Sequence, residues 1–76
     1  MPHVEISHFP AELDATARAR LDADITAAVT RAFGVRDGAV SIGLAVVPKA
    51  EWTEHVYRPL VSGRAEPSGL LRRPDY

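Results

Sequence analysis

Cysteine is absent from this chain of 76 residues. Disulfide bonds and thiolate metal sites are therefore excluded as sources of stability. In a chain of this length a hydrophobic core rarely contributes more than about 3–5 kcal/mol. The length predicts one domain over residues 1–76, which must depend on close packing or on association with further copies.

An excess of charge of either sign is absent as well. Nine basic and ten acidic residues give a formal net charge of −1. A protein that binds phosphates needs a basic excess, so no nucleic-acid partner is expected. The charged fraction of 25% and the hydrophobic fraction of 46% are typical of an ordinary globular protein.

Long hydrophobic runs are also missing. No stretch approaches the roughly 18 apolar residues of a membrane-spanning helix, so no membrane association is expected. The chain opens Met-Pro-His-Val-Glu. This opening lacks the basic and then apolar regions of a secretion signal. The sequence therefore predicts a cytoplasmic protein.

The residues that are present predict an amphipathic helix over residues 14–33. Apolar side chains recur every four positions, which gives the helix one face to bury. Asp14 is a suitable N-cap, and Gly34 stands where a C-cap glycine is usual. The recurring apolar residues are Leu13, Ala17, Leu21, Ile25, Val29 and Phe33.

Strands are predicted on both sides of this helix. Residues 3–9 begin with alternating polar and apolar side chains, the pattern of a half-buried strand, and Pro10 ends it. Residues 39–47 alternate between a strongly apolar face and a weakly polar one. A long helix is the usual crossover between parallel strands. We therefore predict an α/β fold made of a single β-α-β unit with parallel strands.

The rest of the chain is predicted to be less regular. Residues 49–57 suit a short helix or a turn over the sheet. Residues 58–76 contain three prolines and two glycines and are predicted to form an irregular tail, packed on the core or on a partner subunit. Two strands and one helix leave part of the sheet uncovered, and a sheet usually needs three strands or a packing partner. We therefore expect a homo-oligomer, at least a dimer, whose subunits share one sheet.

Pro2 is the leading candidate for a catalytic residue. Methionine before a small second residue is commonly removed, and its loss leaves proline with a free secondary amine. An ordinary α-amino group titrates near ~7.7–8.0, and burial beside apolar groups lowers that pKa. Such an amine is a neutral base near pH 7, which suits general base catalysis. The other interpretation is that proline is simply common at this position and has no catalytic role.

Short motifs follow one another along essentially the whole chain. They are Met-Pro-His-Val-Glu-Ile at the first strand, His8-Phe9-Pro10-Ala11-Glu12-Leu13-Asp14 at its exit, Ala23-Asp24-Ile25-Thr26 in the helix, Val40-Ser41-Ile42 in the second strand, and then Trp52, Val56-Tyr57-Arg58-Pro59 and Leu71-Arg72-Arg73-Pro74-Asp75-Tyr76. In this order and spacing the chain resembles the tautomerase superfamily of 4-oxalocrotonate tautomerase. Within it, the chain is similar to the PptA-type group of phenylpyruvate (enol) tautomerases.

The resemblance implies an isomerase that uses neither a cofactor nor a metal. It implies that two β-α-β subunits pair into a dimer with a four-stranded sheet, and some relatives assemble three dimers into a hexamer. It also implies that the processed Pro2 is a general base. The proline moves a proton between oxygen and carbon of a small 2-hydroxydienoate or enolpyruvate-type substrate, which is a keto–enol tautomerisation.

Two positions depart from the pattern of the 4-oxalocrotonate tautomerases. Those enzymes have an arginine soon after the first strand, where this chain has Glu12. They have a second arginine on the second strand, where this chain has Ser41. The resemblance implies that these arginines bind a dicarboxylate, so we expect a monocarboxylate with an apolar or aromatic end instead.

Three further residues are candidates for substrate binding. Trp52 falls where the family places an aromatic residue that lines the pocket and keeps the proline dry, and it is equally a candidate core or interface anchor. Lys49 offers a point charge to a substrate carboxylate or is simply solvated. Ser41 offers a hydrogen bond or only fits a crowded sheet face. The candidates to replace the missing arginines are Arg58, Arg64, Arg72 and Arg73.

Two other functions stay open. In relatives that hydrate or dehalogenate small unsaturated acids the proline is held protonated, and Glu12 is the residue that would activate water here. The second alternative is a non-catalytic oligomer that binds a ligand. It applies if Met1 is retained, because the Pro2 nitrogen is then acylated and not basic. No metal site is expected, because a regular strand sends His3 and His8 to opposite faces.

Overall fold

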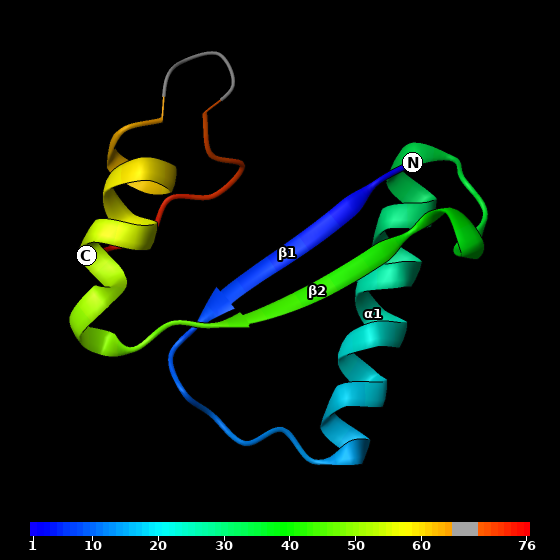
Figure 1. Ribbon diagram of the computed structural model, residues 1–76. Coiled ribbons are helices and arrows are strands. Elements are labelled where there is room, and N and C mark those ends of the chain that lie inside the picture. Colours follow the sequence, from blue (N-terminus) through cyan, green and yellow to red (C-terminus); the bar gives the residue numbers. More distant parts are fainter. Residues whose placement is uncertain (65–68) are drawn as a thin grey trace. The chain divides into compact units, whose positions relative to one another are not determined.

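The computed structural model describes residues 1–64 and 69–76. The chain divides into two compact units, Met1–Val46 and Val47–Tyr76. The first unit contains strand β1 (His3–His8), helix α1 (Ala15–Phe33), the short 3-10 helix η1 (Asp37–Ala39) and strand β2 (Ser41–Val46), in that order (Figure 1). No helix in the described residues is long and apolar enough to cross a membrane.

β1 and β2 lie side by side and run in the same direction (Figure 1). Their register pairs His3 with Ser41 at one end and His8 with Val46 at the other. The α1 crossover joins them, so the predicted β-α-β unit with parallel strands is confirmed. β2 begins later than predicted, because η1 takes up the residues just before it.

Helix α1 begins and ends at the predicted caps. The Asp14 carboxylate accepts a hydrogen bond from the backbone N–H of Ala17 at 2.8 Å. At the other end Gly34 adopts φ 67°, and its N–H donates to the carbonyl oxygen of Thr30 at 2.8 Å. A positive φ of this kind favours glycine, because it lacks the Cβ atom that crowds the left-handed conformation.

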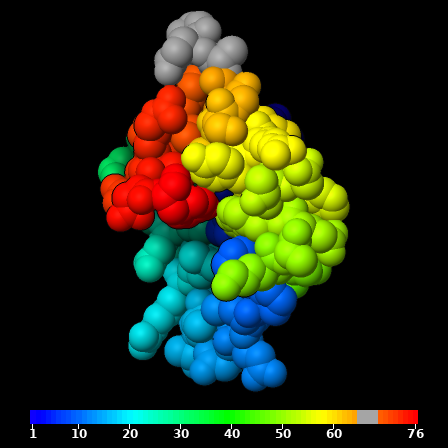
Figure 2. Space-filling view, turned by 90° about the vertical axis from the view of Figure 1, so that its left-hand side faces the viewer, coloured from blue at the N-terminus to red at the C-terminus, as the bar shows by residue number. Residues whose placement is uncertain are grey.

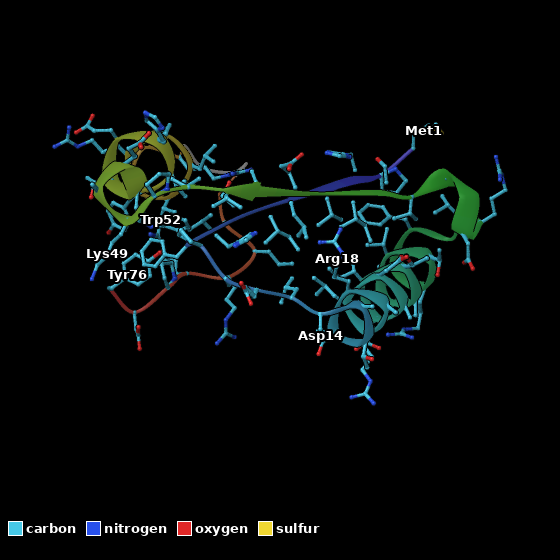
Figure 3. The ribbon with its side chains drawn as sticks, turned by 60° about the horizontal axis from the view of Figure 1, so that its bottom comes forward. Met1, Asp14, Arg18, Lys49, Trp52 and Tyr76 are labelled. Carbon is cyan, nitrogen blue, oxygen red and sulfur yellow. The ribbon has the colours of Figure 1, made fainter. Side chains whose placement is uncertain are left out.

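Helix α1 lies against one face of the two-stranded sheet (Figure 3). Ile42 and Leu44 of β2 and Leu21 of α1 line a groove of about 440 Å³ between the two elements. Arg18 lines the same groove. The apolar residues of β2 therefore face the helix, as their alternation with small and polar residues predicts.

Burial within this unit is shallow. No residue of α1 is fully buried, and Phe33 at its end is 69% exposed. Val46, at the end of β2, is 61% exposed. Among all described residues only Val56, in the second unit, is buried. Apolar side chains are thus left on the surface, where one chain alone supplies no cover.

The second unit contains two helical segments. The 3-10 helix η2 (Lys49–Glu51) leads through Trp52 into η3 (Thr53–Ser62), which is a π-helix. Its last turn closes with the N–H of Gly63 donating to the carbonyl oxygen of Arg58 at 2.8 Å. Pro59 lies inside η3. Proline has no N–H to donate and crowds the preceding turn of an α-helix. The helical segment η3 nevertheless continues through Pro59 with π-type turns.

The predicted tail begins later than the sequence indicated. Residues 58–62 were assigned to an irregular segment on account of their proline, but they belong to η3. Residues 69–76 have no regular structure. Residues 65–68 of the predicted tail lie outside the described residues.

The N-cap of α1 gives a direct test of this local account. Replacing Asp14 with alanine removes the acceptor for the Ala17 N–H, and we expect the free energy of unfolding to fall by about 1 kcal/mol. Denaturant titration followed by far-ultraviolet circular dichroism, at one fixed protein concentration, measures the change. Asp24→Ala is the matched control, because Asp24 is exposed within α1 and caps nothing. Equal losses in both variants would show that the cap contributes nothing specific.

Candidate functional site

Pro2 lies immediately before β1 and is half-buried. Its carbonyl oxygen accepts a hydrogen bond from the backbone N–H of Ser41, at 3.2 Å, so it is fastened to the start of β2. Met1 is fully exposed and projects away from the start of β1 (Figure 3). Removal of Met1 therefore frees the Pro2 nitrogen without disturbing a packed side chain.

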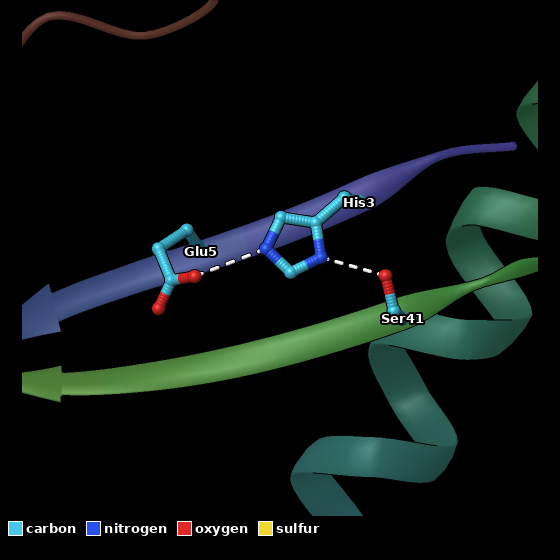
Figure 4. A network of polar contacts seen from close by, with 3 residues as sticks. All are labelled: His3, Glu5 and Ser41. Carbon is cyan, nitrogen blue, oxygen red and sulfur yellow. Dashed lines mark hydrogen bonds and ion pairs between the residues drawn. The ribbon is translucent and has the colours of Figure 1, made fainter.

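Three polar side chains join β1 to β2 beside Pro2 (Figure 4). The Nδ1 atom of His3 lies 2.6 Å from the Oγ atom of Ser41. The Nε2 atom of the same ring lies 3.0 Å from Oε1 of Glu5. The Ser41 hydroxyl is thus engaged with the neighbouring strand, and its role in substrate binding stays a prediction.

Trp52 and Tyr76 lie next to each other in the second unit (Figure 3). The Nε1–H of Trp52 donates to the hydroxyl oxygen of Tyr76 at 3.2 Å. Tyr57 donates its hydroxyl to the backbone carbonyl of Tyr76 at 3.3 Å, and the two tyrosine rings are 5.7 Å apart at 37°. Figure 2 shows the last residues, in red, against the green and yellow residues of η2 and η3. The hydrogen bond to Tyr76 therefore fixes the direction in which the Trp52 indole N–H points.

All the cationic candidates belong to the second unit. Lys49 is exposed, and within the described part of the chain its side chain forms no hydrogen bond or ion pair. Arg58 pairs with Glu54, one helical turn earlier, at 2.5 Å between Nη1 and Oε1. That pairing offsets the charge that Arg58 was expected to offer a substrate. Arg64, Arg72 and Arg73 are exposed.

The positions of the described histidine and acidic side chains bear on metal binding. Over residues 1–64 and 69–76, no group of three or more histidine, aspartate or glutamate side chains is placed to hold a metal ion. His8 and Leu13 line one groove, on the face of the sheet that α1 covers. His3 contacts Ser41 on the opposite face. Glu12 is exposed in the segment between β1 and α1.

Sequence reasoning missed two of these contacts. His3 and Glu5 are two residues apart on a strand, a spacing that puts both on one face. The partner Ser41 follows only from the register, which the sequence does not state. Tyr76 was recognised as part of a motif, but nothing in the pattern showed that it meets Trp52, 24 residues earlier.

Comparison with known proteins gives the family. No protein-family model matches the chain. The tautomerase PptA of Escherichia coli O139:H28 is 33% identical over 76 residues, which are the whole of this chain and 97% of the relative. Proteins of the same name from Enterobacter sp. (strain 638) and Pectobacterium carotovorum are 32% and 26% identical over the same shares. The chain belongs to the tautomerase superfamily and is of the PptA type.

Membership in this family confirms the resemblance found in the short motifs. A tautomerase is an isomerase, and its chemistry is the movement of a proton within one molecule. Such a PptA-type tautomerase needs a group that exchanges protons with the substrate. The residues that the sequence predicts for substrate chemistry divide between the units: Pro2 and Ser41 belong to the first, Lys49 and Trp52 to the second.

The contact between Trp52 and Tyr76 can be tested by fluorescence, because Trp52 is the sole tryptophan. Tyr76→Ala removes both the hydroxyl acceptor and the ring, so water reaches the indole more easily. We expect the emission to move to longer wavelength and quenching by acrylamide to increase. Asp75→Ala, at the neighbouring exposed position, is the control and should leave both unchanged. The contact is refuted if the two variants give the same spectrum as the wild-type protein.

Proposed function

We propose that this PptA-type tautomerase is a cofactor-free keto–enol tautomerase, in which Pro2, released by the loss of Met1, is the general base. Its substrate is a small 2-hydroxydienoate or enolpyruvate-type monocarboxylate. Two observations support the proposal. The relatives named tautomerase align with the whole chain, and Pro2 is held at the start of the sheet by Ser41 while Met1 is fully exposed.

The chemistry needs only one proton carrier. The neutral proline amine takes the proton of the enol hydroxyl, and the electrons of that O–H bond form the carbonyl. The electrons of the carbon–carbon double bond then take a proton from the proline ammonium to form the new C–H bond. The amine ends neutral, and the substrate has gained and lost one proton. A group with a pKa near the working pH suits both transfers.

The positions of the absent family arginines favour a monocarboxylate. Glu12 adds negative charge where one arginine would stand, and the Ser41 hydroxyl is occupied by His3. We propose Lys49 as the cation for the carboxylate, and Trp52, or its equivalent from a neighbouring subunit, as the apolar side chain that keeps water from Pro2. A water-poor site strengthens each electrostatic contact inside it.

We also propose that the working form is a homo-oligomer, at least a dimer. The support is the shallow burial: Val56 is the only buried residue among those described, and Phe33 and Val46 remain largely exposed. A two-stranded sheet with one helix is seldom stable by itself. A second copy that extends the sheet supplies both the missing cover and the missing strands.

The role of Pro2 is tested by Pro2→Ala with phenylenolpyruvate as the substrate. Ultraviolet absorbance follows its ketonisation, and intact mass confirms that Met1 is absent from both proteins. Loss of the ring leaves a mobile primary amine, and we expect kcat to fall by about 100-fold or more. Pro10→Ala, at an exposed proline just after β1, is the control and should keep full activity. Equal rates in the wild-type and Pro2→Ala proteins would remove Pro2 from the mechanism.

The direction of the pH dependence separates a base from an acid. A neutral amine is the active form, so kcat/KM should fall as the pH is lowered through the pKa of the Pro2 amine. A hydratase or dehalogenase that uses a protonated proline loses activity in the opposite direction, as the pH rises. The measurement is kcat/KM across the range in which the protein stays folded. Activity confined to the acidic side would contradict the tautomerase proposal and favour the acid mechanism.

A further inference from the structure

The amine of Pro2 needs a fixed direction, yet it lies at the least constrained part of a chain. The first residues of a domain fray unless something ties them down. Proton transfer depends on close alignment, and a displacement of about 1 Å can cost roughly 100-fold in rate. Pro2 stands just outside β1, and strand pairing reaches it only through its carbonyl oxygen, which accepts from the Ser41 N–H.

We infer that His3 is a positioning residue for Pro2, acting as the centre of a clamp made of Glu5, His3 and Ser41. The inference rests on the proposed function for its effect on catalysis, whereas the clamp itself is a feature of the first unit. Ser41 contributes twice. Its N–H donates to the carbonyl oxygen of Pro2 at 3.2 Å, and its Oγ atom meets His3 Nδ1 at 2.6 Å. Ser41 of β2 therefore binds both Pro2 and His3, at the start of β1.

Glu5 sets the direction of the hydrogen bonds through the ring (Figure 4). An ionised carboxylate only accepts hydrogen bonds, so Nε2 of His3, 3.0 Å away, carries the proton. In the neutral ring the Nδ1 atom is then bare, and it accepts the proton of the Ser41 hydroxyl. Without the carboxylate the ring is free to take the other tautomer or to turn away from Ser41.

Gly43 leaves the space that this arrangement needs. It is the register partner of Glu5, and a Cβ atom at this position would lie 2.7 Å from each carboxylate oxygen. Those oxygens are the free end of a flexible side chain, so a larger residue displaces the carboxylate rather than the backbone. Gly43→Ala should therefore release Glu5 from His3 while Glu5, His3 and Ser41 are all retained.

The clamp acts locally rather than on global stability. The side chains of His3 and Glu5 are 54% and 52% exposed, and exposed ion pairs contribute little to the stability of a fold. Loss of the clamp should loosen the start of β1 and leave the rest of the unit unchanged. A local effect that leaves the rest of the unit unchanged distinguishes a positioning role from a structural one.

Amide hydrogen exchange at Ser41 reports the clamp directly, because this N–H is the donor to Pro2. In His3→Phe we expect its exchange to become roughly threefold to tenfold faster, the effect of losing one local hydrogen bond. Amides in the middle of α1 should keep the wild-type rate. With phenylenolpyruvate, kcat should fall about tenfold to 100-fold with little change in KM. Gly43→Ala should likewise speed amide exchange at Ser41 and lower kcat.

Two amide variants sharpen the test. In His3→Asn, the side-chain amide lies near the position of Nδ1 and reaches Ser41. In His3→Gln, the longer side chain carries its amide toward Glu5 instead. The clamp predicts that His3→Asn keeps most of the Ser41 protection and of kcat, and that His3→Gln loses both. Ser7→Ala, on the same face of β1 but away from the contact, is the control and should behave as wild type.

The outcomes decide between the clamp and the proposed function. A wild-type exchange rate at Ser41 in His3→Phe, or equal behaviour of the asparagine and glutamine variants, overturns the clamp. Faster exchange with unchanged kcat overturns the positioning role of His3. Full activity in Pro2→Ala overturns the proposed function instead, and the exchange measurement still tests the clamp, because it needs no substrate.

Discussion

The parallel pairing of β1 with β2 is the interaction on which the candidate site depends. The strands are joined by α1, and their register sets His3 opposite Ser41 and Glu5 opposite Gly43. That register brings the Ser41 N–H to the carbonyl of Pro2. A shift of one residue would turn every side chain to the other face and separate the polar contacts beside Pro2. The geometry around the amine is therefore a consequence of strand pairing rather than of a preformed cavity.

Shallow burial is the second constraint, and it connects the fold to the proposed assembly. One helix covers one face of a two-stranded sheet, and only Val56 is buried among the described residues. A small chain without disulfides has few other sources of stability. Phe33 of α1 and Val46 of β2 are exposed apolar residues, and the proposed oligomer would give them a contact surface.

Much of the fold follows from the sequence because its signals are local. The caps Asp14 and Gly34 delimit α1, and alternation marks both strands; the short motifs also indicated the family that the relatives confirm. The contacts of the site are not local. The hydrogen bond between His3 and Ser41 spans 38 positions and depends on register, which one sequence does not reveal. The helical state of residues 58–62 was missed because Pro59 normally ends an α-helix, while a π-helix admits it.

In the proposed mechanism the Pro2 amine is neutral when it takes the enol proton. Nitrogen NMR of protein labelled with ¹⁵N-proline tests it most directly, because Pro2 becomes the one secondary amine among six prolines once Met1 is removed. We expect the Pro2 resonance to titrate with the same midpoint as the acidic limb of kcat/KM. A nitrogen that never titrates, or that stays protonated across the pH range of full activity, would contradict it.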